Sequence, residues 1–241
     1  MEAYSHLAAV YDKLMDDVDY DAWAAYIDGF IEMKSAVIFE AACGTGSLSY
    51  RFCQKGHKVI AADVSEDMLR IAAAKARHFG CSVTFIKQNM GDIRIGNAVD
   101  AVVSACDGPN YLDGDGLRHF IEGSYVALNQ RGVLLFDIGT RAKLAAMDGQ
   151  VFFDDDDDLT CIWQNAYNQA THKLCIDVTL FIREDGLFKK QYETHTQYAH
   201  SISDIICIVQ QTGFSHVQVF DCFSRRPYTA ETQRAQFVCR K

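Results

Sequence analysis

Residues 36–47 read AVIFEAACGTGS, and this stretch decides the fold class. A short apolar run ends in Glu40, and a turn with Gly44 and Gly46 leads into the helical segment LSYRFCQKG. Glycines between a strand and a helix let the backbone approach a ligand and present helix N-terminal amides to it. The same order recurs at once: HKVIAADVS ends near Asp63, and Ser65 can cap the helix EDMLRIAAAKARHFG.

Three further apolar segments continue this alternation of strand and helix. They read SVTFIKQNM, AVDAVVSACDG and VLLFDIG, with the helical segment LRHFIEGSYVALNQRG before the last of them. Near-continuous apolar strands alternating with helices indicate a parallel sheet covered on both faces. The prediction is a doubly wound, mostly parallel α/β sheet of the seven-strand, Rossmann-like type. Its ligands should sit at the carboxyl ends of the strands, where we expect Glu40, Asp63, Asn89, Asp107 and Asp137.

The chain divides into four parts by pattern. Residues 1–33 show helical spacing and predict an N-terminal cap, and residues 34–148 form the cofactor-binding core. Residues 149–200 alternate polar and apolar side chains, which predicts an inserted antiparallel lid of three strands. Residues 201–241 return to the α/β pattern and complete the core sheet. The exposed edge of an inserted sheet can pair with a second chain, so a homodimer is one expectation.

Composition narrows the class of protein. The net charge is −9 and the basic residues are dispersed, which disfavours nucleic acid as a partner. The N-terminus lacks the pattern of a secretory signal, and no apolar run is long enough for a membrane span. We therefore expect a cytoplasmic protein with no membrane partner. Its nine cysteines are scattered without a CxxC pair, so we expect reduced thiols and no metal site.

Two signals favour a ligand that contains adenosine. The glycine turn is the first, and Asp63, which follows Glu40 by 23 positions, is the second. A carboxylate at that point can accept hydrogen bonds from both hydroxyls of a ribose. The dinucleotide fingerprint requires a third glycine where this chain has Ser49, and Glu40 suits an ammonium group better than a pyrophosphate. A nicotinamide-dependent oxidoreductase is therefore the less favoured alternative.

The segments FEAACGTGSLSYRF and VIAADVSEDMLRIAAAKA resemble motif I and its neighbour in class I S-adenosylmethionine-dependent methyltransferases. YDKLMDDVDYDAW, QNMGDI, AVVSACDGPNYL, FDDDDDLTCIWQNAYN and FVCRK extend the likeness to a bacterial branch with an inserted β-rich segment. The resemblance implies S-adenosylmethionine as cofactor and a methyl-transfer activity. The cofactor-binding positions that it implies are Tyr11, Trp23, Glu40, Ala42, Gly44, Gly46, Asp63, Val64, Met68, Asn89, Met90 and Cys106.

Two of these positions depart from the family pattern. Ala42 replaces the first motif glycine, and Asn89 replaces the usual acid beside the adenine, a role that Asp92 could take over. These departures leave open a third reading, a non-catalytic module that binds the cofactor or a protein partner.

The acceptor of the methyl group is expected to be a small molecule. Its candidate contacts are Asp107, Asn110, Tyr111 and His195, of which Asp107 and His195 are also the candidate catalytic residues. His195 shares one strand face with Glu193 and Gln197, and its pKa range suits a base. The acidic run Asp154–Asp158 is interpreted as a solvated loop.

Overall fold

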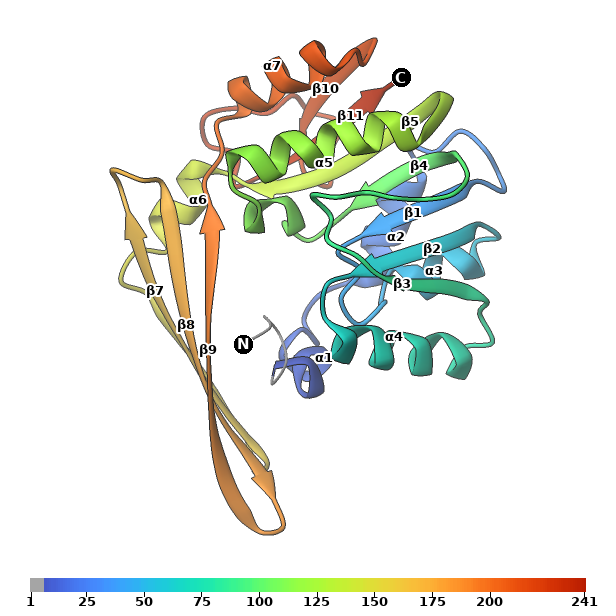
Figure 1. The fold of residues 1–241 in the computed structure, drawn as a ribbon. Helices are drawn as coiled ribbons and strands as arrows, with labels where there is room; N and C mark the ends of the chain where they lie inside the picture. Colours follow the sequence, from blue (N-terminus) through green and yellow to red (C-terminus); the bar gives the residue numbers. More distant parts are fainter. Residues whose placement is uncertain (1–6) are drawn as a thin grey trace.

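The computed structural model describes residues 7–241. Two sheets make up the fold, a seven-stranded one at the centre of an α/β core and a four-stranded one beside it (Figure 1). The central sheet has the order β10-β11-β5-β4-β1-β2-β3, in which β11 runs antiparallel to both neighbours. Its strands are β1 Val37–Ala41, β2 Lys58–Asp63, β3 Val83–Lys87, β4 Val99–Ser104, β5 Leu128–Gly139, β10 His216–Asp221 and β11 Arg234–Arg240. The prediction of a doubly wound, mostly parallel seven-strand sheet is confirmed.

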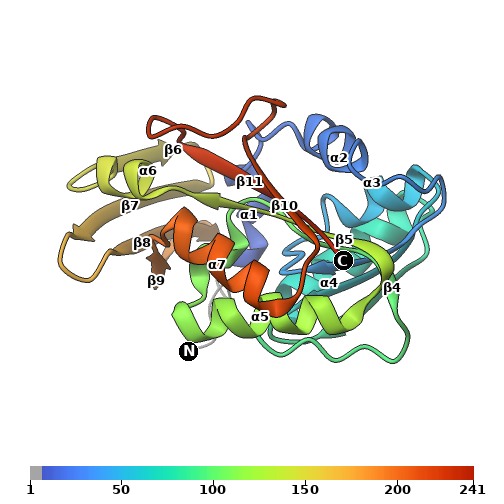
Figure 2. The same cartoon turned by 90° about the horizontal axis from the view of Figure 1, so that it is seen from above.

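Helices cover both faces of the central sheet (Figure 2). One face carries α2 Tyr20–Asp28 and α3 Ser49–Gln54, whose Ile27 and Phe52 pack on Ile38 and Val103. The other face carries α5 Gly114–Ala127 and α7 Ile202–Thr212. The helix α4 Glu66–His78 packs along β2 and β3 at the edge of the sheet. Burial on both faces explains why β1 and β4 read as continuous apolar runs.

Side-chain caps set the starts of several helices. The hydroxyl of Ser65 accepts from the backbone N–H of Met68 at 3.3 Å and opens α4, and Ser201 accepts from Asp204 N–H and opens α7. Both caps follow the strong preference of serine for this position. At its other end α7 stops at Gly213, whose φ of 108° is the left-handed conformation that glycine adopts freely.

The second sheet is the inserted lid, and it has four strands where three were predicted. Its order is β6 Val151–Asp155, β7 Leu159–Asn168, β8 Lys173–Glu184 and β9 Leu187–Tyr198, with every pair antiparallel. The missed strand β6 is exposed at every residue, so its side chains lack the alternation of a half-buried strand. A short helix between the sheets, α6 Arg141–Ala146, was also missed.

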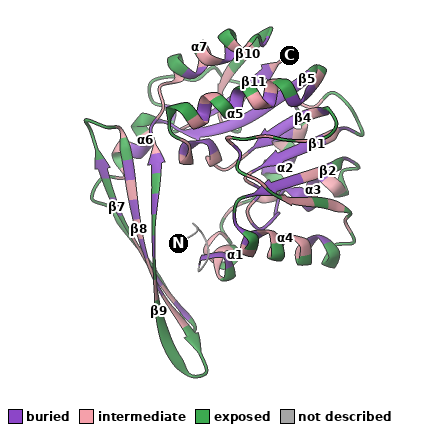
Figure 3. Cartoon of the chain, in the orientation of Figure 1, coloured by how far each residue is buried: buried purple, intermediate pink, exposed green. Residues whose placement is uncertain are grey.

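The N-terminal cap lies between the lid and the core. It consists of η1 Leu7–Ala9 and α1 Tyr11–Leu14, followed by α2. Leu7, Val10, Tyr11 and Leu14 pack with the inner face of the lid in a third apolar cluster. In Figure 3 the lid strands carry buried residues near the core, whereas the far end of the β8–β9 hairpin is exposed. Within residues 7–241, no helix has the length and apolar character to cross a membrane.

Candidate cofactor and active site

The turn between β1 and α3 adopts a backbone that glycine makes possible. Gly44 and Gly46 have φ values of 54° and 71°, in the left-handed region. A Cβ at Gly46 would lie 2.8 Å from the Cβ of Ala72 in α4, so only glycine fits between the turn and that helix. Ala42 also has a positive φ of 56°, and it therefore carries its methyl group in a strained conformation.

Two buried acids stand at the carboxyl ends of β1 and β2. Glu40 accepts a hydrogen bond from the hydroxyl of Ser49, and Asp63 accepts from the backbone N–H groups of Gly44 at 2.8 Å and Ser65 at 2.9 Å. Burial raises the pKa of Glu40 to about 8 and also raises the pKa of Asp63. Among residues 7–241, no Lys, Arg or His nitrogen lies within 4.0 Å of either carboxylate. The described part of the chain thus holds two buried acids without pairing them with a cation.

A cavity of about 310 Å³ opens above these two acids. Most of the predicted cofactor positions line it, together with Tyr111, and the ones that do are Tyr11, Glu40, Ala42, Gly44, Asp63, Val64, Met68, Asn89, Met90 and Cys106. The two predicted positions absent from the lining are Gly46, which packs against Ala72 of α4, and Trp23. None of the described residues that line the cavity is Lys, Arg or His. Glu40 and Asp63 are therefore the only Asp or Glu side chains, with no basic side chain beside them, in the described part of the lining.

Sequence reasoning missed several lining residues. They are Tyr20, Cys43, Thr45, Ser47, Leu48, Gln88, Ala105, Gly108 and Leu112. Tyr20 falls on the same spacing as core residues of α2 such as Ile27, so the sequence pattern favours helical packing over ligand contact. The other missed residues flank predicted positions in the chain, so closer attention to the strand ends would have found them.

Val64, Met68 and Asn89, three of the predicted cofactor-binding residues, all line the cavity. Val64 is 43% exposed and Met68 is 2% exposed, so the two offer an apolar contact at the rim and at the floor. The side-chain oxygen of Asn89 accepts from the backbone N–H of Gly91 at 2.8 Å, and a carbonyl has a second lone pair to offer. Asp92 is exposed and pairs with Arg94 at 2.9 Å instead of facing the cavity.

The cap is tied to the glycine turn. Asp12 of α1 accepts a hydrogen bond from Thr45 at 2.6 Å and pairs with Lys75 of α4 at 2.7 Å. Lys75 also donates to Thr45 and Ser47, so one cation joins the cap, the turn and α4. This network places Tyr11, the neighbour of Asp12, over the cavity.

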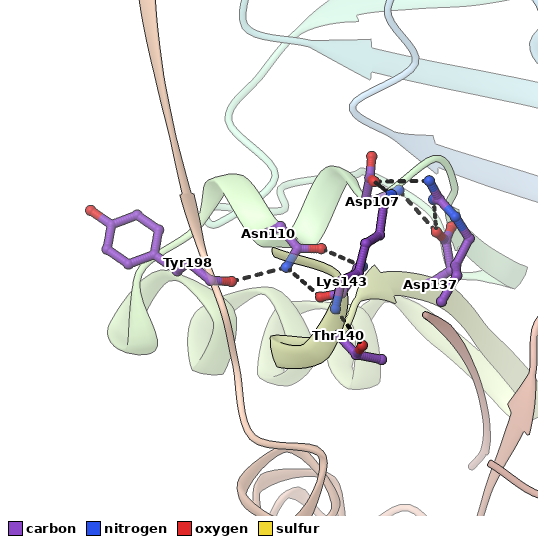
Figure 4. A network of polar contacts seen from close by, with 8 residues as sticks. Asp107, Asn110, Asp137, Thr140, Lys143 and Tyr198 are labelled. Carbon is purple, nitrogen blue, oxygen red and sulfur yellow. Dashed lines mark hydrogen bonds and ion pairs between the residues drawn. The ribbon is translucent and has the colours of Figure 1, made fainter. Parts of the chain in front are cut away.

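A cluster of charged side chains lies beside the cavity, at the ends of β4 and β5 (Figure 4). The Oδ2 atom of Asp107 accepts from Lys143 at 3.1 Å and from Arg234 at 2.9 Å, and Arg234 also pairs with the buried Asp137. Burial opposes the ionisation of Asp107, but the two cations hold its pKa below the usual value. Burial raises the pKa of Asp137, which keeps one carboxylate oxygen without a hydrogen-bond partner among residues 7–241.

Asp107 sits between two lining residues, Cys106 and Gly108, with a φ of 54°. Its Oδ1 atom receives no hydrogen bond from the described part of the chain, whereas Oδ2 receives two. Asp107 itself is absent from the lining, so the structure presents an ionised carboxylate beside two lining residues in the chain, with one oxygen that accepts no hydrogen bond from the described residues.

Two other predicted residues, Asn110 and Trp23, make structural contacts and do not line the cavity. Asn110 is completely buried, donates to the carbonyls of Gly139 and Tyr198, and accepts from the N–H of Gly139 at 2.8 Å (Figure 4). It ties the end of β5 to the end of the lid strand β9. Trp23 packs edge-on against Phe223 with ring centroids 4.5 Å apart, and the guanidinium of Arg234 lies 5.6 Å from the Trp23 ring. Neither placement supports contact with a ligand.

His195 lies on the inner face of β9, where Glu193 and Gln197 are also buried. Its ring centroid is 6.2 Å from that of Tyr111, which lines the cavity, and its Nε2 is 3.4 Å from a Glu193 oxygen. His195 thus lies beside a residue of the cavity lining, and its catalytic role stays a prediction.

These residues fit a cationic adenosine ligand. A buried carboxylate is costly unless an opposite charge accompanies it, and the cavity supplies two such carboxylates and no cation. A dinucleotide would bring a pyrophosphate into this negative field, whereas S-adenosylmethionine carries a sulfonium and an ammonium group. Asp63 at the end of β2 stands where a ribose is held in this kind of fold. The fold and the site together define a class I S-adenosylmethionine-dependent methyltransferase.

Comparison with known proteins agrees. Residues 38–132 match the family described as "Methyltransferase domain". The Bacillus subtilis (strain 168) protein named "Putative methyltransferase YqeM" is 30% identical, with 99% of this chain and 97% of the relative covered. A relative from Geobacillus sp. (strain WCH70) with the same description is 29% identical, with 99% of each chain covered. A solved S-adenosylmethionine-dependent methyltransferase from Clostridium acetobutylicum ATCC 824 is 27% identical, with a TM-score of 0.86 and 99% of each chain covered. The chain belongs to the S-adenosylmethionine-dependent methyltransferases, and S-adenosylmethionine is its cofactor.

Proposed function

We propose that this methyltransferase acts on a small, uncharged nucleophile, an amine or a hydroxyl compound, held beside the cavity by Asp107. The observation that carries the proposal is the ionised Asp107 carboxylate, which follows Cys106 and precedes Gly108, two lining residues, in the chain and whose Oδ1 atom accepts no hydrogen bond from the described residues. The enclosure of the cavity by the cap, which contributes Tyr11 to the lining, supports a small molecule.

The charge of the site supports this class of acceptor. When bound, S-adenosylmethionine supplies a methyl group that its sulfonium makes electrophilic. A neutral nucleophile gains positive charge as it accepts this group, and a nearby fixed carboxylate stabilises that charge. A carboxylate acceptor would instead meet Asp107, Glu40 and Asp63. Lys143 and Arg234, the cations beside Asp107, are already paired with it.

Positioning is the main contribution of the protein to the reaction. Holding two reactants close and aligned is worth about 7–11 kcal/mol, and Tyr11, Tyr20 and Tyr111 surround the space in which this occurs. Asp107 has a lowered pKa, so it serves as a hydrogen-bond acceptor and a charge partner rather than as a base. His195 is kept as a positioning residue that acts on the ring of Tyr111.

The first test is calorimetric titration with S-adenosylmethionine, S-adenosylhomocysteine and NAD⁺. We expect micromolar binding of the first two and none of NAD⁺. Release of S-adenosylhomocysteine is then measured with panels of small amines, phenols, alcohols and carboxylates, and we expect turnover in the first three panels only. Turnover of carboxylates alone, or cofactor binding without turnover of any panel, would overturn the proposal.

The role of Asp107 is tested with Asp107→Asn once an acceptor is found. We expect kcat to fall by about 10- to 100-fold while the dissociation constant of S-adenosylmethionine changes little, because the lost charge acts on the acceptor. Asp92→Asn is the matched control, since Asp92 is an exposed carboxylate outside the cavity. An unchanged kcat in Asp107→Asn would contradict this role.

A further inference from the structure

The lid sheet has an outer face that is unexpectedly apolar. Residues that pair across antiparallel strands point to the same face of a sheet. The inner face is buried against the cap, for example at Val178 and Leu180. The opposite face carries an outer lid patch, which consists of Val151, Phe153, Ile162, Phe181, Phe188 and Tyr192.

This patch is largely exposed. Val151, Phe153, Phe188 and Tyr192 are 59%, 65%, 52% and 51% exposed. Phe153, Ile162 and Tyr192 belong to one row across the sheet, because Phe153 pairs with Ile162, and Thr179 joins Ile162 to Tyr192. Single exposed apolar side chains are ordinary, whereas several of them on one sheet face, here interrupted by Thr179, mark an interaction surface.

Charges at the two edges of this face indicate the partner. The next row runs from Asp155 on β6 through Thr160 and Phe181 to Lys190 on β9. Asp155 and Lys190 stand three strand spacings apart, about 14 Å, which is too far for them to pair within one chain. A two-fold axis parallel to the strands would lay β6 of one copy across β9 of the other. Asp155 would then meet Lys190 twice, once on each side of the axis.

We infer that the outer lid patch is the interface of a homodimer, in which two lid sheets pack face to face around such an axis. Two aligned sheets commonly pack in this way through apolar side chains. Pairing through the free edge of β6 is disfavoured, because β6 has five residues and ends in Asp154 and Asp155. Short, charged edges are the means by which proteins prevent such pairing.

The dimer would stabilise the cap over the cofactor cavity, because the lid sheet lies between the dimer interface and the cap. The inner face of the same sheet holds the cap, since Glu193 accepts from the N–H of Leu7 at 3.0 Å and Asp156 pairs with Lys13. The cap in turn places Tyr11 over the cavity. A second copy that covers the outer face would therefore steady the cover of the cofactor cavity. This inference does not depend on the identity of the acceptor.

Sedimentation equilibrium of the full chain tests the inference. A chain of 27.0 kDa should sediment at twice that mass at micromolar concentration. Phe153→Glu should raise the dissociation constant of the dimer by about 100-fold or more, because it places a charge in the apolar row. Val126→Glu is the matched control, as Val126 is 79% exposed on α5 and lies outside the patch. Circular dichroism verifies that each variant is folded.

A charge exchange tests the axis itself. Lys190→Glu and Asp155→Lys should each weaken the dimer by about tenfold, and the double variant should return to within about threefold of the wild type. A dimer that Phe153→Glu leaves intact, or whose single charge variants are not rescued in combination, would overturn the proposed interface. A wild-type chain that stays monomeric at about 100 µM would overturn the dimer altogether, and would leave the outer lid patch to another partner.

Discussion

Two pairs of acids stand at the carboxyl edge of the same sheet, and the protein treats them in opposite ways. Glu40 and Asp63 receive hydrogen bonds from a hydroxyl and from backbone amides, and burial raises the pKa of each. Asp107 and Asp137 instead share the guanidinium of Arg234, and Asp107 also pairs with Lys143. One pair lacks a cation from the described chain, and the other has its own.

This difference separates the acids that need the cofactor from those that do not. An acid pair that the chain neutralises itself needs no cationic cofactor, and it joins β4, β5, β11 and α6 at one point. An acid pair without a cation is an unfavourable arrangement that a cationic ligand relieves. The cofactor of this family carries two positive groups, and the unneutralised pair is the one that lines the cavity.

The largest effect is expected at the self-neutralised pair. Arg234→Met should lower the free energy of unfolding by about 3–5 kcal/mol, because it leaves Asp107 and Asp137 buried without their shared cation. Urea denaturation without cofactor measures this change. Arg226→Met is the control, since Arg226 makes an exposed ion pair with Asp221 that is worth no more than about 1 kcal/mol. Equal changes in the free energy of unfolding would show that the buried cluster stabilises the fold no more than an exposed ion pair does.

The second effect concerns the pair that awaits a ligand. Asp63→Asn should weaken S-adenosylmethionine binding by about 100-fold, because the amide removes a charge and one of the acceptor oxygens for a ribose. Calorimetry gives the affinity, and thermal unfolding shows whether the bonds to Gly44 and Ser65 persist. Asp92→Asn should bind like the wild type. A loss of less than about threefold in Asp63→Asn would remove Asp63 from the cofactor site.

A smaller effect follows from the raised pKa of Glu40, about 8. At pH 7 the free protein holds this carboxyl mostly protonated, whereas a cationic ligand favours the carboxylate. Affinity should therefore rise with pH by up to about tenfold per unit below pH 8 and level off above it. Proton release on binding, from calorimetry in buffers of different ionisation enthalpy, measures the same linkage.

Glu40→Gln provides the test of that assignment. It cannot ionise, so both the rise of affinity with pH and the proton release should disappear. A pH dependence that survives in Glu40→Gln would mean that another group, such as Asp63, is the one that titrates.

The sequence predicts where Glu40 and Asp63 lie, but it does not predict the cation that pairs with Asp107 and Asp137. Glu40 and Asp63 are visible because each ends an apolar strand before a glycine turn or a capped helix, a local pattern that the periodicity exposes. The cation that holds Asp107 and Asp137 is invisible in the sequence. Arg234 lies 127 residues from Asp107, and only the antiparallel pairing of β11 with β5 brings them together.

The same limit explains the misses in the lid and the cap. The lid strand β6 has no buried side to leave an alternating pattern, and Tyr20 follows the spacing of helix residues that do face the core. Asn110 was predicted at the acceptor because it follows a strand end, yet its amide is occupied by β5 and β9. A strand end shows where a side chain lies along the sheet, but long-range packing decides whether it faces the cavity.

The smallest effect is expected at Ala42, the residue that distinguishes this turn from its family pattern. Its φ of 56° costs an alanine about 1–2 kcal/mol, while glycine adds about 0.4–1 kcal/mol of entropy to the unfolded chain. Ala42→Gly should therefore raise the free energy of unfolding by about 0.5–1 kcal/mol and change cofactor affinity by less than about threefold. Ala74→Gly, at an exposed position inside α4, should instead lower stability by about 1 kcal/mol. Opposite signs in urea denaturation would show that Ala42 is strained. A loss in both variants would mean that its methyl group, which lies near Gly108, contributes more by packing than the left-handed backbone costs.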